Sequence, residues 1–295
     1  MKQEQGNGDK RATASCDYAG SADAGSGAGN AYEQRSATAA AVTAEQLASL
    51  AGPEPCLVVE GLSAGYGNME VLHHFDLQIA RAQSVCLIGP NGAGKSTVLN
   101  AIYGFATVFS GRMRASAGDA EHDLTRLTPS QKLSEARIAY VLQENSAFPD
   151  MSVEENLWIG GHLLGKASRA KRKADEIFTA YPQLALRRRH AAGVLSGGER
   201  RLLEISRALM MEPEILLIDE PSIGLEPRFI DVVFEVLGEL QHRQRKTIVM
   251  VEQNARRALE FADIGYVLVA GETAMAAPAA QLLSDAEVGR LFLGG

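Results

Sequence analysis

A short glycine-rich segment constrains the fold of this chain more than any other feature. Residues 89–96, Gly-Pro-Asn-Gly-Ala-Gly-Lys-Ser, match the pattern G-x-x-x-x-G-K-[ST], with an apolar run at 85–88 before them and a helical pattern at 96–103 after them. In such a unit the glycines let backbone N–H groups converge on an anion, and the positive end of the helix points at the same place. The segment therefore predicts a phosphate-binding loop in an α/β domain, rather than a tight turn that carries a surface lysine.

The residue types of this phosphate loop (residues 89–96) predict which atoms bind a nucleotide. Lys95 is expected to reach the β- and γ-phosphates as a point charge, and the Ser96 hydroxyl is expected to bind Mg²⁺. The expected ligands are thus the phosphates of a nucleotide and Mg²⁺. The candidate binding residues in and directly after the loop are Asn91, Gly92, Ala93, Gly94, Lys95, Ser96 and Thr97.

Two adjacent acids follow another apolar run further along the chain. Residues 215–218 are Ile-Leu-Leu-Ile, and Asp219 and Glu220 come directly after them. A carboxylate at the end of a strand can hold Mg²⁺, directly or through water, and we assign that role to Asp219. Glu220 is expected to face the nucleotide and to act as the general base that polarises the attacking water. Many buried strands end in an acid where a helix begins, so this motif gains its meaning from the phosphate loop.

Strand and helix patterns alternate along the rest of the chain. This alternation indicates an α/β domain with a mostly parallel sheet. The region from 151 to about 200 begins without strand signals, so we expect an inserted helical subdomain there. The predicted strands lie at 57–60, 71–80, 84–88, 138–142, 215–218, 247–251 and 265–269, and the predicted helices at 96–103, 153–161, 170–181, 199–211, 228–241 and 255–262.

Composition separates the chain into two parts and disfavours several classes of protein. Ala, Gly and Ser make up roughly half of residues 1–52, and this segment has too little apolar surface to offset the entropy of ordering. We therefore expect a disordered tail, in which residues 37–50 could form a short helix, before one domain at 53–295. The sequence contains no run of 18 uncharged apolar residues, which argues against a transmembrane helix. The net charge of −7 disfavours nucleic acid as a partner, because proteins that bind it are usually basic. Three widely spaced cysteines fit a reducing cytoplasm.

A third motif gives the chain a family resemblance. Residues 195–199, Leu-Ser-Gly-Gly-Glu, match the LSGGQ signature of ABC-type ATPases, except that Glu199 stands where the family usually has Gln. The phosphate loop, a Gln after a strand (Gln143), the signature and the acidic strand follow one another as they do in that family. The chain therefore resembles the nucleotide-binding subunit of an ABC transporter over about residues 57–293. The resemblance implies a P-loop NTPase core with a mostly parallel sheet, an antiparallel β edge and the inserted helical subdomain.

The resemblance also implies roles for individual residues. Tyr66 would stack on the adenine, and Gln143 would touch Mg²⁺ or the attacking water and sense the membrane partner. Ser196 and Gly198 would bind the γ-phosphate of the ATP held by the opposite subunit, and residues 222–225 would cross the dimer interface as the D-loop. On residue chemistry alone, Ser196 is also a good helix N-cap.

The chain departs from the family at the switch position. After the strand the family usually places a His that contacts the γ-phosphate, whereas this chain has Gln253. An amide can donate a hydrogen bond but carries no positive charge, which weakens the case for fast independent hydrolysis. The run Val-Glu-Gln-Asn-Ala at 251–255 nevertheless resembles one subfamily, the second ATP-binding subunit of branched-chain amino acid importers, with close relatives for urea and short amides.

These resemblances imply a mechanism, partners and a location. One chain holds one phosphate loop and one signature, and in the geometry of the family that it resembles these two belong to different composite sites. The resemblance therefore implies that two ATP-binding subunits sandwich two ATP molecules head to tail. The implied partners are a sister ABC ATPase subunit or a second copy of this chain, two transmembrane permease subunits and, indirectly, an external substrate-binding protein, with no nucleic acid. The implied location is peripheral, on the cytoplasmic face of the bacterial plasma (inner) membrane. The main expectation is ATP-driven uptake of branched-chain amino acids.

Two alternatives stay open on the sequence, and a third is disfavoured. The same subunit would equally power uptake of urea or short amides, because the permeases and the binding protein choose the substrate. A regulatory subunit that binds ATP and hydrolyses it poorly is the second alternative, because of Gln253. The third class, ABC ATPases that act on DNA or ribosomes, is disfavoured by the short interval between Lys95 and Ser196, by the single nucleotide domain and by the acidic charge.

Overall fold

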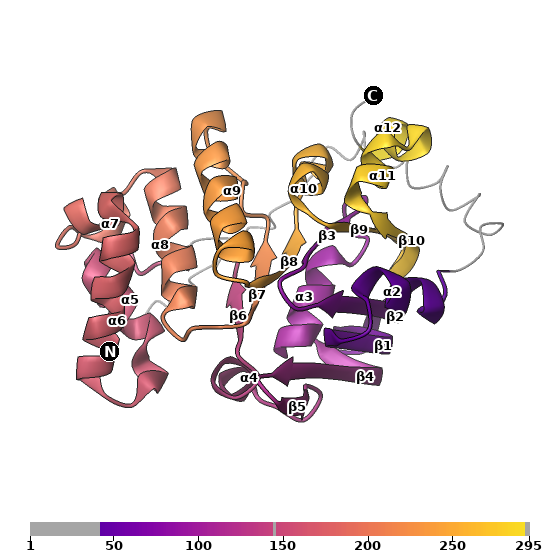
Figure 1. The fold of residues 1–295 in the computed structure, drawn as a ribbon, viewed down its shortest axis with the longest axis horizontal. Helices are drawn as coiled ribbons and strands as arrows, with labels where there is room; N and C mark the ends of the chain where they lie inside the picture. The colour runs from indigo at the N-terminus through magenta and orange to yellow at the C-terminus, as the bar shows by residue number, and fades with distance from the viewer. Residues whose placement is uncertain (1–41, 144–145, 293–295) are drawn as a thin grey trace, which may run out of the picture.

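The computed structural model describes residues 42–143 and 146–292, and its centre is a six-stranded sheet (Figure 1). The strand order is β10-β9-β3-β8-β7-β6. Neighbouring strands are parallel, except that β10 pairs antiparallel with β9. This sheet confirms the predicted α/β fold. Its strands are β3 (Ser84–Ile88), β6 (Ile138–Val141), β7 (Ile215–Asp219), β8 (Thr247–Val251), β9 (Ile264–Val269) and β10 (Glu272–Pro278).

Both faces of this sheet are covered, which explains why its central strands read as continuous apolar runs. Every residue of β3, β7, β8 and β9 is buried. Successive side chains of β3 point to opposite sides of the sheet. Val85 and Leu87 belong to one apolar core, and Cys86 and Ile88 belong to the other. Helix α3 (Lys95–Tyr103) fills the first core, between the two sheets of the molecule (Figure 1).

An antiparallel sheet of four strands, in the order β2-β1-β4-β5, forms the predicted β edge. Its strands are β1 (Pro55–Tyr66), β2 (Met69–Ala80), β4 (Thr107–Ala117) and β5 (Ala120–Asp123). Leu57 and Val59 of β1 pack into the same core as α3. The sequence does not predict β4, because the run Ser110-Gly111-Arg112 interrupts it and most of its first half is exposed. The short β5 likewise lacks an apolar alternation.

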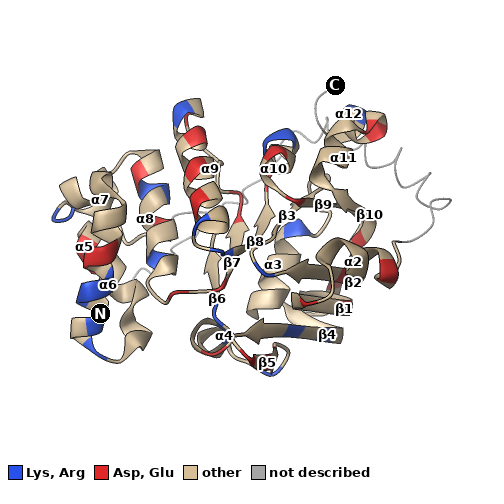
Figure 2. Cartoon of the chain, in the orientation of Figure 1, with Lys and Arg blue, Asp and Glu red and all other residues tan. Residues whose placement is uncertain are grey.

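The region between β6 and β7 is helical, as predicted, and its described residues contain no strand. Acidic and basic residues alternate along its helices (Figure 2). Arg188 pairs with Glu154 and Asp175, and Lys173 pairs with Glu212, so part of the basic charge in this region is neutralised locally. Its helices are α5 (Val153–Gly160), α6 (Ala167–Ala180), α7 (Pro182–Leu186) and α8 (Gly197–Leu209), and the short α4 (Pro129–Ser134) precedes β6.

Helix α2 (Ala44–Ala51) falls inside the segment for which the composition predicts a disordered tail. Thr43 and Gln46 form a capping box at its start, and Leu47 is 1% exposed in the core shared with β2. This short helix packs because it adds one apolar face to a core that the two sheets already build. The packed part of the chain thus begins before residue 52. Residues 1–41, the rest of the predicted tail, lie outside the described residues.

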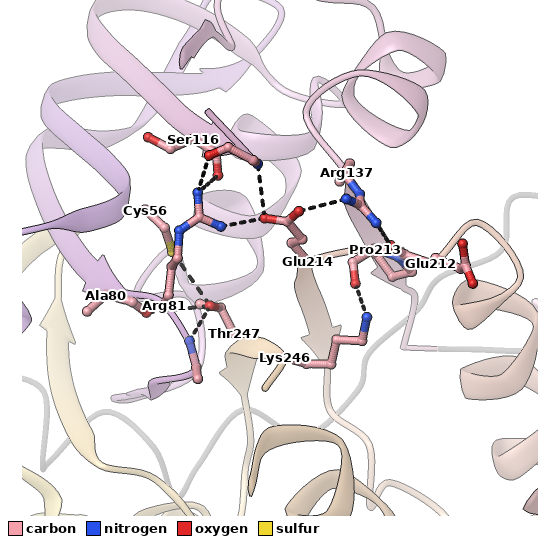
Figure 3. Close-up of polar contacts among 12 residues, drawn as sticks. Cys56, Ala80, Arg81, Ser116, Arg137, Glu212, Pro213, Glu214, Lys246 and Thr247 are labelled. Atoms are coloured by element: carbon pink, nitrogen blue, oxygen red, sulfur yellow. Dashed lines mark hydrogen bonds and ion pairs between the residues drawn. The ribbon is translucent and has the colours of Figure 1, made fainter. Parts of the chain in front are cut away.

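A polar cluster joins the two sheets at the end of the parallel strands that lies away from the phosphate loop (Figure 3). The Glu214 carboxylate, just before β7, accepts hydrogen bonds from Arg81, between β2 and β3, and from Arg137, before β6. Arg81 also donates to the backbone oxygen of Ser116 on β4 at 3.3 Å. Lys246, before β8, donates to the backbone oxygen of Pro213 at 2.6 Å. The cluster therefore ties the antiparallel sheet to the starts of three parallel strands.

The remaining helices cover the outer face of the parallel sheet and the carboxyl-terminal edge (Figure 1). No helix in the described part of the chain is long and apolar enough to cross a membrane. These helices are α9 (Pro227–His242), α10 (Ala255–Phe261), α11 (Ala279–Ser284) and α12 (Ala286–Phe292).

Candidate nucleotide-binding site

The carboxyl ends of four parallel strands meet at one edge of the sheet and bring most of the predicted site residues together. Strand β3 leads into the phosphate loop, and β6 ends just before Gln143. Strand β7 ends at Asp219, and β8 is followed by Glu252 and Gln253. Because β3, β8, β7 and β6 are neighbours in that order, these residues form a row beside the phosphate loop.

The phosphate loop has a backbone that only glycine tolerates at its first position. Gly89 has a φ of +149°, and a Cβ atom there would lie 2.1 Å from the backbone oxygen of Leu268 on β9. Within the loop, Gly94 is the N-cap of α3 and provides no side chain to occupy the helix start. The first N–H groups of α3 are therefore available to an anion. Among the other predicted binding residues, Asn91 and Gly92 are exposed, whereas Ala93 and Thr97 are buried.

Lys95 is a buried cation held inside this loop. Its Nζ donates to the backbone oxygens of Gly89 and Pro90, each at 2.9 Å, and the residue is 7% exposed. Burial lowers the pKa of Lys95, and the carboxylates of Glu220 and Asp219 oppose that shift. The ammonium group thus lies between the phosphate cradle and the acids at the end of β7, where a phosphate anion would complete its surroundings.

Asp219 lies buried at the end of β7 with hydroxyl groups beside both carboxylate oxygens. Ser96 Oγ donates to Asp219 Oδ1 at 3.0 Å, and the Tyr140 hydroxyl lies 3.2 Å from Oδ2. Burial raises the pKa of Asp219, and the hydrogen bonds from Ser96 and Tyr140 oppose that shift. A desolvated carboxylate next to a serine hydroxyl is a donor set that suits a small divalent cation, which prefers oxygen ligands.

Glu220 and Gln143 are joined directly. Gln143 Nε2 donates to Glu220 Oε2 at 2.8 Å, which connects the residue after β6 to the residue after β7. Glu220 has a φ of +43°, which is rare for a residue with a side chain, and its N–H donates to the backbone oxygen of Val251 at 2.8 Å. Burial, Asp219 and Glu252 together raise the pKa of Glu220. A higher pKa brings the carboxylate closer to the range in which a general base works at neutral pH.

Glu252 is a site residue that sequence reasoning missed. It is 2% exposed, and its carboxylate accepts hydrogen bonds from Ser222 Oγ at 2.8 Å and from the backbone N–H groups of Ser222, Gln253 and Asn254. It therefore links the segment after Glu220 to the segment that carries Gln253, whose own side chain is exposed. The available signal was an acid directly after a buried strand, followed by Asn254 as the N-cap of α10.

A chain of polar side chains connects Tyr66 to this acidic centre. Tyr66 is 42% exposed, and its hydroxyl accepts a hydrogen bond from Asn100 Nδ2 at 2.7 Å. Asn100 Oδ1 lies 3.2 Å from the hydroxyl of Tyr140, which also reaches Asp219. The single hydroxyl proton of Tyr140 can serve one of these two acceptors at a time. Sequence reasoning identified Tyr66 and Asp219, at the two ends of this series of side chains, but not Asn100 or Tyr140 between them.

The signature residues lie on the helical subdomain, and their contacts are local. Ser196 is the N-cap of α8, as predicted, and forms a capping box with Glu199. The Glu199 carboxylate thus accepts hydrogen bonds from the Ser196 N–H at 2.9 Å and from Arg187 Nε at 3.3 Å. Gly198 lies against Phe229, where a Cβ atom would be 2.4 Å from Cδ1 of the ring. The structure thus groups Ser196 and Gly198 with each other, and none of these contacts involves the phosphate loop.

Fold and site together define a P-loop ATPase of the type that combines a core sheet, an antiparallel edge and a helical subdomain. Residues 72–223 match the family model described as ABC transporter. The chain is 38% identical over 239 residues to the high-affinity branched-chain amino acid transport ATP-binding protein BraG of Pseudomonas aeruginosa, which covers 81% of this chain and all of that protein. It is 30% identical over 257 residues to the protein named LivG of Escherichia coli, with 82% and 98% covered.

Solved structures agree with these relatives. A nucleotide-free ATP-binding cassette from an ABC transporter and a cassette in its ADP conformation each superpose with a TM-score of 0.70 at 27% identity. Each match covers 82% of this chain and all of the solved chain. The chain belongs to the ABC transporter family of ATP-binding proteins. It is an ATP-binding and ATP-hydrolysing subunit whose activity is coupled to transport.

Proposed function

We propose that this chain powers the import of branched-chain amino acids through separate permease subunits. The observation that carries the proposal is the 38% identity to a relative named for branched-chain amino acid transport, over the whole length of that relative. The identity to the protein named LivG is lower, at 30%, so the chain is more similar to BraG than to LivG. The run at 251–255 resembles the second ATP-binding subunit of branched-chain amino acid importers, and we assign the chain to that type.

The residues of the site receive the following roles in this proposal. Lys95 and the backbone of residues 91–97 bind the β- and γ-phosphates, and Tyr66 stacks on the adenine. Mg²⁺ neutralises phosphate charge when bound, and Ser96, Asp219 and Gln143 would hold it. Glu220 accepts the proton of the attacking water, and Gln143 orients that carboxylate through their 2.8 Å hydrogen bond.

The position of the signature residues supports a composite site. Ser196 and Gly198 lie on a different subdomain from the phosphate loop, so a second ATP-binding subunit would bring its own phosphate loop to them. The finer arrangement that we propose is a head-to-tail pair with a sister ATPase or a second copy of this chain. The pair would drive two permease subunits that an external binding protein supplies, and it would lie on the cytoplasmic face of the bacterial inner membrane.

Gln253 favours a second candidate function. Its exposed amide stands where the family usually has a His, so it carries no positive charge toward the γ-phosphate. A subunit of this kind would bind ATP, close the dimer and leave most of the hydrolysis to the sister subunit. Import of urea or short amides is the alternative substrate within the main proposal.

The test is uptake of labelled leucine by cells of the source organism that lack this chain. Wild type is expected to restore uptake, whereas Lys95→Ala and Glu220→Gln should leave it at least about tenfold lower, because each removes one part of phosphoryl-transfer chemistry. Lys171→Ala, on the exposed face of α6, is the matched control and should restore uptake.

The outcomes separate the candidates. If deletion leaves leucine uptake unchanged in a strain without a second leucine system, the substrate is wrong, and urea and short amides are measured next. If Lys95→Ala abolishes uptake but Glu220→Gln supports it fully, this chain binds ATP without needing to hydrolyse it, and the regulatory candidate is correct.

A further inference from the structure

We propose that a buried ion pair on helix α8, Arg201 with Glu204, positions Gln143 and Glu220 for ATP hydrolysis. The proposal rests on the roles given to Gln143 and Glu220 above. Each member of the pair is 5% exposed, and Arg201 Nη1 donates to Glu204 Oε2 at 3.0 Å. Both residues lie on the helix that the signature residue Ser196 caps, so the pair belongs to the helical subdomain while it contacts the site.

The Arg201 guanidinium holds two backbone oxygens next to the proposed reacting groups. Its Nη1 donates to the oxygen of Leu142 at 2.7 Å, and its Nη2 donates to the oxygen of Asp219 at 2.9 Å. Leu142 directly precedes Gln143, and Asp219 directly precedes Glu220. One rigid planar group therefore fixes the separation between the two backbone positions from which Gln143 and Glu220 reach each other.

Glu204 holds the chain on the other side of Gln143. Its Oε1 accepts hydrogen bonds from the backbone N–H of Ser146 at 2.9 Å and of Ala147 at 3.3 Å. Arg207, three residues further along the same face of α8, donates to the backbone oxygen of Ser146. Its guanidinium also lies 5.5 Å from the centre of the Phe148 ring. The described residues on both sides of Gln143 are thus fastened to α8.

Stability alone is a weak reason for such a pair. Removing two charges from water has a cost, and replacing a buried pair by uncharged residues of similar shape is often neutral or stabilising. Arg201 Nε adds to that cost, because it has no hydrogen-bond partner among the described residues. What the pair achieves is placement, because it connects helix α8 to the backbone on both sides of Gln143 and to the end of β7. Arg201 and Glu204 are therefore positioning residues, since they act on the site through Gln143 and Glu220.

The test measures kcat, KM for ATP and the melting temperature of the full chain in its assembled transporter, for three variants. Arg201→Gln and Glu204→Gln each leave one buried charge without its partner and should lower the melting temperature by several degrees. The double variant removes both charges and should recover most of that loss. We nevertheless expect it to keep KM within about threefold and to lose about tenfold in kcat, because misplaced groups slow the chemical step. The exposed pair of Glu239 on α9 and Arg243, the residue that caps the end of α9, is changed to Gln in the same way and should alter neither quantity.

Coupling to Gln143 provides the readout that a purely structural pair would not change. If the pair acts through Gln143, then Gln143→Ala should lower kcat strongly in the wild-type chain but only slightly in the double variant. A double variant with wild-type melting temperature and wild-type kcat would overturn the proposal. The proposal would also fail if the kcat losses of Gln143→Ala and of the double variant multiply when the changes are combined, as independent effects do. If Gln143→Ala and Glu220→Gln keep full kcat in the otherwise wild-type chain, the roles proposed for those residues fail instead.

Discussion

Three carboxylates at the ends of β7 and β8 show how single residues of one type acquire different properties. Asp219 is flanked by the hydroxyls of Ser96 and Tyr140, whereas Glu220 receives one amide hydrogen bond. Glu252 accepts four hydrogen bonds, three of them from backbone N–H groups. Four donors therefore hold the Glu252 carboxylate in place, whereas a single donor contacts the carboxylate of Glu220. The surroundings, rather than the residue type, separate the structural carboxylate from the proposed base.

Glu252→Gln tests this distinction at the residue scale. A Gln amide offers one acceptor oxygen in place of two, so its NH₂ group would face the Ser222 N–H, which is also a donor. We expect the free energy of unfolding to fall by about 1–3 kcal/mol, as for a buried donor that loses its partner. Urea unfolding measures the change, with Glu272→Gln on the exposed start of β10 as the control. Equal values for Glu252→Gln and wild type would show that the four contacts do not hold this segment.

At the scale of secondary structure, the sequence predicts the elements whose patterns arise from burial. The central strands β3, β7 and β8 are continuous apolar runs between two cores, and they coincide with the predicted strands to within a residue. Strand β10 is mostly half-exposed and rich in Ala, and β4 is interrupted by polar residues, so neither has a clear period. Both gain their structure from pairing with a neighbour, which no local pattern records.

The candidate site follows the same division. The residues in contiguous motifs, such as Lys95 and Asp219, could be predicted because the chemistry needs those types at a fixed spacing. Asn100, Tyr140 and Arg201 could not, because they reach the site from α3, β6 and α8 only after folding. Their roles depend on distances between segments far apart in the sequence.

Helix α4 provides a prediction at the scale of an element. Lys132 is 2% exposed, its Nζ donates to the backbone oxygen of Ile102 at the end of α3 at 2.7 Å, and burial lowers its pKa to about 8. An unfolded lysine has a pKa of about 10.4, so between about pH 8 and pH 10.4 the unfolded chain binds a proton that the folded chain has released. The folded state therefore gains stability from Lys132 as the pH rises through this window.

Lys132→Met removes this dependence. We expect the difference in unfolding free energy between wild type and Lys132→Met to shift by roughly 2–3 kcal/mol in favour of wild type between pH 7.5 and pH 10. Urea unfolding at both values gives the difference, in which other titrating groups cancel. Lys171→Met, on an exposed face, should show no shift; the same difference at both pH values for Lys132→Met would refute the assignment.

At the scale of the whole molecule, the polar cluster around Glu214 (Figure 3) connects the two sheets in addition to their shared apolar core. Glu214→Gln should lower the free energy of unfolding by about 1–2 kcal/mol, because the partly exposed carboxylate serves Arg81 and Arg137 at once. The loss should shrink in 1 M salt, which screens the charges. Glu121→Gln, from an exposed pair with Arg114, is the control and should change little. A loss no larger than that of the control would mean that apolar packing alone joins the sheets.

The backbone of Glu220 has a consequence for how this protein can change. A side chain held at a φ of +43° costs about 1 kcal/mol or more relative to glycine, which adopts this region freely. At position 220 a substitution that raises thermal stability is therefore expected to lower the rate of ATP hydrolysis. In laboratory evolution that rewards heat resistance alone, glycine or asparagine should replace this glutamate early, and the surviving clones would fold better while losing their proposed base. A lineage selected for the rate of hydrolysis must keep the strained glutamate, so its thermal stability can increase only through substitutions at other positions.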